Sequence, residues 1–195
     1  NNNECNMNIG LYITMSETDG SGNIIKRGSE FKANSLVQGF SAILNALMTA
    51  TSVTVPDTSN ASRAVSANAS CFQATGATAG NTALGIVAGT GTNAVAVTDY
   101  ALQTLIAQGT SSGQLEYSAQ SFGAWTQSGG DAYSSHTRTL LNNSGGDITI
   151  NELGYVVRGN STTTHYFLID RTLPTPYTVT NGSGVVIEYK WKVTV

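Results

Sequence analysis

The sequence has little charge. Asp, Glu, Lys and Arg make up 11% of the 195 residues, less than half of the roughly 25% that is usual for a soluble domain. The nine Lys and Arg residues are spread along the chain and the net charge is −3, so the sequence lacks the basic patch that nucleic-acid binding requires. We therefore expect no nucleic-acid partner, and a surface that is solvated mainly by hydroxyl and amide groups.

Long apolar runs are also missing. The most apolar stretch lies around Ala42–Met48, which is far shorter than the roughly 20 residues that cross a bilayer as a helix. The sequence therefore predicts no membrane insertion.

Cysteine is scarce, with only Cys5 and Cys71. An even pair suits a disulfide in an oxidising compartment, but two cysteines this far apart also fit a reduced protein. The sequence leaves both alternatives open.

Motifs of catalysis and cofactor binding occur only as isolated matches. Gly89–Ala94 fits the G-x-G-x-x-A pattern of a dinucleotide-binding loop, but alternating β-branched and small residues follow it, so no helix N-terminus is available for a pyrophosphate. Ser111 lies in a G-x-S-x-G match with His136 and His165 downstream, yet both flanks of the match are polar loop rather than strand and helix. We therefore expect a protein that is not an enzyme and holds no organic cofactor.

A calcium site has weak support. Asp19, Ser21 and Asn23 have the spacing of the first three ligands of a calcium-binding loop. Ile24 stands where that loop needs glycine, and no helix precedes it. The segment is more typical of a β-hairpin turn, with these three residues as the one metal candidate in the sequence.

The apolar pattern predicts a mainly β fold with one N-terminal amphipathic helix, either a β-sandwich or a jelly-roll-like domain. We expect a flexible polar arm over residues 1–8 and a single domain over residues 9–195. The helix is expected over about 34–50, with Asn34 or Ser35 as its N-cap. Strands are expected over 9–15, 24–26, 53–55, 64–65, 84–88, 114–122, 136–141, 148–158, 165–170 and 185–195.

Three segments carry a resemblance to a known group of proteins. They are G-I-V-A-G-T-G-T-N-A-V-A-V-T-D-Y-A-L from Gly85, N-E-L-G-Y-V-V-R-G from Asn151, and Y-F-L-I-D-R from Tyr166. In these segments the chain resembles a family of uncharacterised structural proteins encoded by tailed phages and prophages. The resemblance implies a virion component and brings no catalytic residue with it.

Assembly with other chains is expected for a physical reason as well. Terminal strands with unpaired edges are templates for pairing with a neighbour, although they can equally close their own sheet. We expect copies of the same chain, and other virion or surface-filament proteins, to be the partners. The residues expected at the interface are Ile9, Leu11 and Ile13 in the first strand, and Leu36, Phe40, Ile43 and Leu47 on the helix stripe.

Three functions follow from the sequence. The first is a structural subunit of a phage head or tail, located in the virion. The second is a secreted, extracellular subunit of a cell-surface filament that polymerises by strand exchange. The third is a glycan- or receptor-binding sandwich, whose stacking faces would be Trp125, Tyr133, Tyr155 and Tyr177.

Overall fold

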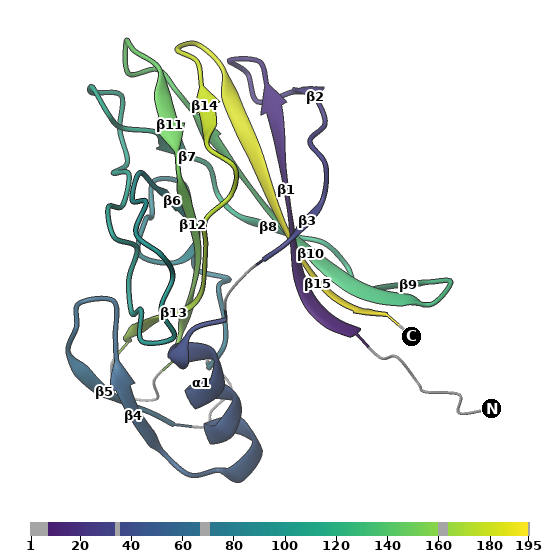
Figure 1. The fold of residues 1–195 in the computed structure, drawn as a ribbon, viewed down its shortest axis with the longest axis vertical. Coiled ribbons are helices and arrows are strands. Elements are labelled where there is room, and N and C mark those ends of the chain that lie inside the picture. Colours follow the sequence, from purple (N-terminus) through teal and green to yellow (C-terminus); the bar gives the residue numbers. More distant parts are fainter. Residues whose placement is uncertain (1–7, 34–35, 67–70, 160–163, 195) are drawn as a thin grey trace.

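The fold is known from a computed structural model, which describes residues 8–33, 36–66, 71–159 and 164–194. Two layers of antiparallel strands face one another, and one helix and a short hairpin lie at one end of the second layer (Figure 1). The elements are β1 (Asn8–Thr18), β2 (Ile24–Lys26), β3 (Phe31–Lys32), α1 (Gln38–Thr49), β4 (Val53–Pro56), β5 (Ser62–Val65), β6 (Gly85–Gly89), β7 (Glu116–Tyr117), β8 (Ser121–Phe122), β9 (Thr126–Ser128), β10 (Asp131–Leu141), β11 (Ile148–Ile150), β12 (Glu152–Arg158), β13 (Tyr166–Thr172), β14 (Tyr177–Val179) and β15 (Gly184–Thr194).

The first layer is a sheet of eight strands built around β15, which has β1 on one side and β10 on the other. Each of these three strands has 11 residues, and both pairings run along their full length. Short strands complete the sheet, with β2 and β3 beside β1, and β7, β8 and β9 beside β10. The N-terminal and C-terminal strands therefore pair with each other within one chain.

The second layer contains the sheet β13-β12-β6 and the pair β11-β14. The core lies between the layers, where Ile13, Ile187 and Tyr189 of the first layer join Tyr155 and Phe167 of the second in one buried cluster. Burial of this apolar surface supplies most of the stabilising free energy. The expected mainly β sandwich with a single helix is confirmed for the described part of the chain.

The helix begins later than expected. α1 spans Gln38–Thr49, and its N-cap is Val37, which makes no side-chain capping hydrogen bond. The backbone just before it is extended, because Leu36 forms an antiparallel bridge with Asp170 and the Val37 N–H donates to the Ile169 carbonyl oxygen. The expected N-caps, residues 34 and 35, lie outside the described residues.

Two expected strands are divided. The region 114–122 forms β7 and β8, and the region 148–158 forms β11 and β12 in two different sheets. The second division is at Asn151. Its backbone N–H and its side-chain amide donate to the carbonyl oxygens of Gly89 and Thr90, so the chain changes its partner at this residue. Periodicity alone does not reveal such a change of partner.

The N-terminal arm lies outside the described residues, except for Asn8, which is the first residue of β1. Within the described ranges, no helix has the length and apolar character that a membrane span needs.

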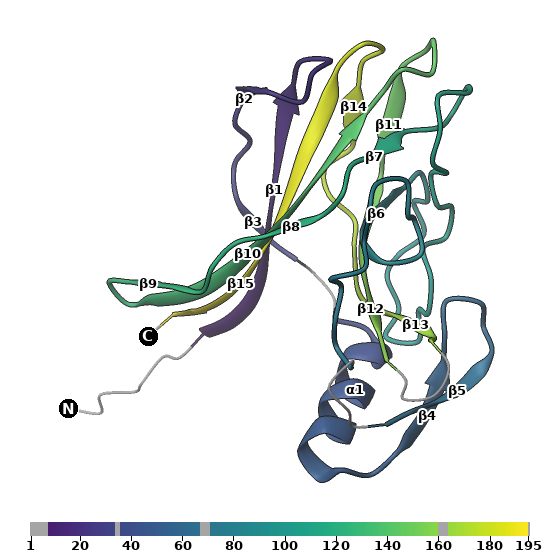
Figure 2. The ribbon, with the colours of Figure 1, turned by 180° about the vertical axis from the view of Figure 1, so that it is seen from behind.

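The two layers diverge toward one end of the molecule. The start of β1, the start of β10 and the end of β15, with β9 beside them, curve away from the second layer, and both views show this (Figures 1 and 2). α1 lies at the same end, below the second layer.

Candidate functional site

The residues of the hydrolase-like pattern serve other contacts. Ser111 is exposed in a loop, and its backbone N–H donates to the Gln114 side chain. His136 forms a hydrogen bond with the Tyr155 hydroxyl, and His165 lies 3.6 Å from the Asp57 carboxylate. In the described structure these three residues make separate contacts, which do not assemble a nucleophile, a base and an orienting acid.

The glycine-rich segment after β6 is folded around a buried carboxylate. Glu152 is completely buried, and its two oxygens accept hydrogen bonds from the backbone N–H groups of Gly91, Gln103 and Thr104 and from Nε of Arg171 at 2.8 Å. This ion pair and these amides satisfy the carboxylate without water.

The glycines of this segment are needed for that close approach. A Cβ atom at Gly89 or at Gly91 would lie 2.5 Å from Oε1 of Glu152. Arg171 also donates to Asp99 at 2.9 Å and to the Asn93 carbonyl oxygen at 3.2 Å, so it holds the far part of the loop. The G-x-G-x-x-A match is thus explained by packing against Glu152.

Arg138 is the second buried polar centre. Only 1% of the residue is exposed, and its guanidinium makes five hydrogen bonds to backbone carbonyl groups and lies 5.0 Å from the Tyr117 ring centroid. Burial lowers the pKa of Arg138 to about 10, so it remains charged at neutral pH. The acceptors are the carbonyl oxygens of Thr78, Asn81, Leu84, Ile86 and Ser118.

A third buried group joins the two layers. Asp170 of β13 is completely buried and accepts a hydrogen bond from the Tyr189 hydroxyl of β15 at 3.2 Å and from the Thr172 hydroxyl at 3.1 Å. Burial raises the pKa of Asp170 to about 7. Nearby, burial lowers the pKa of His136. Asp170 and Tyr189 are enclosed by the core, and their hydrogen bond joins the two layers.

The calcium candidate is a hairpin turn. Asp19 accepts hydrogen bonds from the backbone N–H groups of Ser21 and Asn23 and from the Asn23 side-chain amide. These bonds lower the pKa of Asp19, the Asn23 side chain contributing most. Ser21 and Asn23 thus act as donors to Asp19, and across the described ranges no three His, Cys, Asp or Glu side chains gather as a metal site would need.

A groove of about 430 Å³ with a mainly apolar lining lies between α1 and the diverging end of the first layer. We call it the α1 groove. Leu36, Phe40, Leu44 and Leu47 line its helix side. Leu36, Leu44 and Leu47 are all exposed to solvent.

The sheet side of the α1 groove is also apolar. Leu11, Ala132, Trp191 and Val193 line it, and Trp125 contributes from the loop before β9. Trp125 is 67% exposed. Two apolar walls therefore face one another with solvent between them, which is unusual for a surface that has no partner.

The base of the α1 groove is rigid. Phe40, Phe72 and Trp191 form a cluster of rings with centroid separations of 5.9 to 6.2 Å. Such packing holds the helix against the sheet at the bottom of the groove.

The predicted interface residues divide into two groups. Leu36, Phe40 and Leu47 line the α1 groove, and Leu11 is on its floor with 4% of its surface exposed. Ile13 and Ile43 are completely buried in the chain's own core, so their assignment to an intermolecular surface is wrong. The described part of Ile9 is its backbone in β1, and its side chain lies outside the description.

The other predicted residues are dispersed. Tyr155 is a core residue, Tyr133 lies beside Lys190 and also contributes to the lining of the α1 groove, and Tyr177 lines a different cleft. Cys71 is a buried free thiol that donates to the Ser66 carbonyl oxygen. Cys5 lies outside the described residues, so the disulfide stays a prediction.

Apart from Leu11, sequence reasoning missed the sheet side of the α1 groove. The alternation of β15 places Trp191 and Val193 on the same face as Ile187, which predicts that they are core residues. No local signal in the sequence shows that the second layer leaves this part of the face uncovered. Trp125 in a polar loop was the one available hint.

Comparisons of this chain with protein-family models, with curated proteins and with solved structures find no match.

Proposed function

We propose that this chain is a non-enzymatic structural subunit that associates with copies of itself through the α1 groove. The observation that carries the proposal is the groove itself, with two apolar walls and a ring-packed base that remain open to solvent. A monomer that left this surface in water would lose the stabilisation that its burial provides, about 25 cal/mol per Å² of apolar surface.

A second copy is the partner that the surface fits best. The apolar side chains at the rims, Leu44 and Leu47 on one side and Trp125 on the other, are themselves exposed, so apposing two grooves covers both rims at once. The charged residue in the lining is Lys192, whose ammonium group is paired with Glu30 at 3.4 Å and Asp131 at 3.7 Å. Two apposed grooves thus bring together no unpaired like charges, which would oppose association.

We further propose the virion of a tailed phage as the setting, because of the resemblance in the segments beginning at Gly85, Asn151 and Tyr166. A low-charge, hydroxyl-rich surface fits such an extracellular particle. The partners would then be copies of this chain and other virion proteins.

A filament formed by exchange of a terminal strand has less support. β1 and β15 pair with one another along their whole length. The outer edge of β13 is also occupied, by the Val37 N–H on Ile169 and the Thr58 N–H on Tyr166. The long strands therefore have few open edges for an incoming strand.

The test is sedimentation velocity of the full chain over a wide concentration range. We expect the wild type to form dimers or larger species as concentration rises, and Leu47→Glu to weaken this association more than tenfold, since each factor of ten requires only about 1.4 kcal/mol. Leu47 is exposed on a helix, so the variant should keep its fold, and circular dichroism checks this.

Ile25→Asp is the matched control, because Ile25 is also an exposed apolar residue and lies in β2 at the other end of the molecule (Figure 1). It should associate as the wild type does. A wild type that stays monomeric at high concentration, or equal weakening by Leu47→Glu and Ile25→Asp, would refute the proposal.

A further inference from the structure

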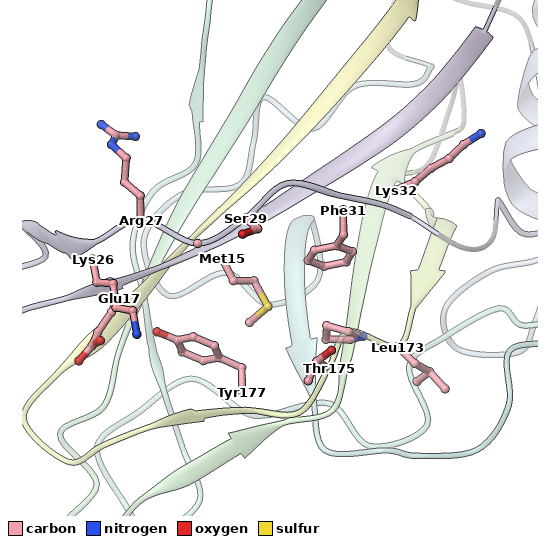
Figure 3. Close-up of a pocket in the computed structure, with 12 residues that line it drawn as sticks. Met15, Glu17, Lys26, Arg27, Ser29, Phe31, Lys32, Leu173, Thr175 and Tyr177 are labelled. Atoms are coloured by element: carbon pink, nitrogen blue, oxygen red, sulfur yellow. The ribbon is translucent and has the colours of Figure 1, made fainter.

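A second cleft, of about 590 Å³, lies at the edge of the sandwich, far from α1. One wall is β1 with the segment from β2 to β3, and the other is the segment 173–177 that leads into β14. Figure 3 shows Met15, Phe31 and Tyr177 facing the space between the walls. We call it the Tyr177 cleft; its volume lies within the range of about 300–1,000 Å³ that is typical of small-molecule sites.

Three polar groups meet at one end of this cleft. Glu17 and Lys26 are cross-strand partners in the pairing of β1 with β2, so the backbone holds them side by side. Figure 3 shows both beside the end of the cleft toward which the Tyr177 hydroxyl points. The charge of Glu17, second to burial, raises the pKa of Tyr177, as expected for neighbouring groups.

These three side chains have no partner among the described residues. No hydrogen bond or ion pair of the described chain engages the side chains of Glu17, Lys26 or Tyr177. On the same sheet, Lys190 is paired with Glu30 at 2.8 Å. A carboxylate acceptor, an ammonium donor and a hydroxyl beside an apolar floor are thus left available to a ligand.

The edge of β1 is closed to an extended peptide at this point. The Gly28 N–H donates to the Ser16 hydroxyl at 3.3 Å, and the Gly28 backbone packs so tightly on β1 that a Cβ atom there would collide with the Met15 carbonyl oxygen. A peptide that added a strand to the sheet would need this backbone edge. The cleft therefore suits a compact ligand better than a protein segment.

The charges indicate a neutral ligand. Glu17 and Lys26 offset each other, while the Arg27 and Lys32 side chains point away from the space in which Met15, Phe31 and Tyr177 lie (Figure 3). A pyranose ring has one face of C–H groups, which packs on an aromatic ring, and vicinal hydroxyls, which bridge a carboxylate and an ammonium group.

From this arrangement we infer that the Tyr177 cleft binds a neutral saccharide, with the Tyr177 and Phe31 rings against its apolar face and Glu17 and Lys26 on its hydroxyls. The site is separate from the α1 groove. Loss of saccharide binding would leave self-association unchanged, and the reverse also holds.

The experiment uses the full chain labelled with ¹³C at the methionine methyl groups. Met15 lies in the cleft and Met48 is exposed on α1, so one spectrum contains a reporter and an internal reference. The probes are the methyl glycosides of glucose, galactose, mannose and N-acetylglucosamine, each titrated to on the order of 50 mM, since weak complexes have Kd values of about 1 mM. We expect at least one glycoside to shift the Met15 signal in a saturable way and to leave Met48 unmoved.

Variants assign the contacts. Tyr177→Ala and Glu17→Gln should each raise Kd about tenfold or more, because they remove the stacking face and the charged acceptor. Glu17 is at the surface, so its variant cannot be dismissed as unfolded. Tyr133→Ala, an aromatic truncation outside the Tyr177 cleft, should leave the Kd for the glycoside unchanged.

Several outcomes would overturn the inference. These are no shift of Met15 with any of the four glycosides, equal shifts of Met15 and Met48, or binding that Tyr177→Ala and Glu17→Gln do not weaken. A response of Met15 to a short acidic peptide such as triglutamate, with none to the glycosides, would also overturn it in favour of Lys26 as an anion contact.

Discussion

The two halves of β15 present the same alternation of side chains to two different surroundings. In the first half, Val185, Ile187 and Tyr189 are completely buried between the layers. In the second half, Trp191 and Val193 point to the same side but are only half-buried and line the α1 groove.

The difference comes from what lies opposite. The first half faces β12 and β13 of the second layer, and the hydrogen bond between Tyr189 and Asp170 joins the two. The buried side chains of Arg138 and Glu152 hold the adjoining loops in place. The second half has curved away from that layer, with α1 across the groove (Figure 2). The comparison shows that an apolar strand face is core only where another layer covers it.

The largest effect is expected at Arg138. Arg138→Met leaves five carbonyl groups, two of them in buried hydrogen bonds, without this donor, so the free energy of unfolding should fall by about 3–5 kcal/mol. Urea denaturation measures this. Arg63→Met, at a side chain that is 44% exposed, should cost less than about 1 kcal/mol. Equal losses would show that the covered part of the sandwich does not depend on the Arg138 guanidinium.

The next effect is a pH dependence at Asp170, which lies opposite the first half of β15. The folded state holds the pKa of Asp170 at about 7, above the ordinary 3.8, so the unfolded chain releases this proton at lower pH. The contribution of Asp170 to the free energy of unfolding is therefore fully present below about pH 4. It falls by up to about 4 kcal/mol as the pH rises to about 7.

Asp170→Asn should remove this slope. The change is measured as the difference between wild-type and variant unfolding free energies at each pH, which cancels His136, whose burial-lowered pKa acts in the opposite direction. If the difference does not change between about pH 4 and pH 7, Asp170 is not protonated in the folded core.

The smallest effects come from a matched pair on β15 itself. Val185→Ala should cost about 2 kcal/mol, because it opens space between packed layers, whereas Val193→Ala should cost less than about 1 kcal/mol in the monomer. Thermal or urea unfolding at low protein concentration checks both values. Similar costs would mean that the diverging end is packed as well as the rest of the sheet.

Much of the fold was predictable from local patterns. The alternation over 185–195 and the β-branched run from Ile9 predicted the two terminal strands, and the stripe from Leu36 to Met48 predicted the helix. The helix start was misplaced because Leu36 and Val37 pair with β13, a contact between distant segments. β14 was not expected, since its three residues are stabilised by β11 and not by their own pattern.

The candidate sites were less predictable. The helix side of the α1 groove follows from the 3.6-residue period of α1, but Ile43 of the same stripe turned out to be core, because it faces the second layer. For the Tyr177 cleft the sequence offered one residue, Tyr177, among the four candidate stacking residues. Glu17 and Lys26 are 160 and 151 positions from it in the chain, so only folding brings them together.

The sequence by itself determined the class of the molecule. Low charge, period-two alternation and one amphipathic stripe are local properties, and they specify a mainly β domain with one helix and show which residues share a face. The tertiary structure alone decided which part of each face is covered, that Arg138 and Glu152 are buried, and that two open clefts remain. Burial depends on the elements that lie opposite a residue, and those are set by contacts between segments far apart in the chain.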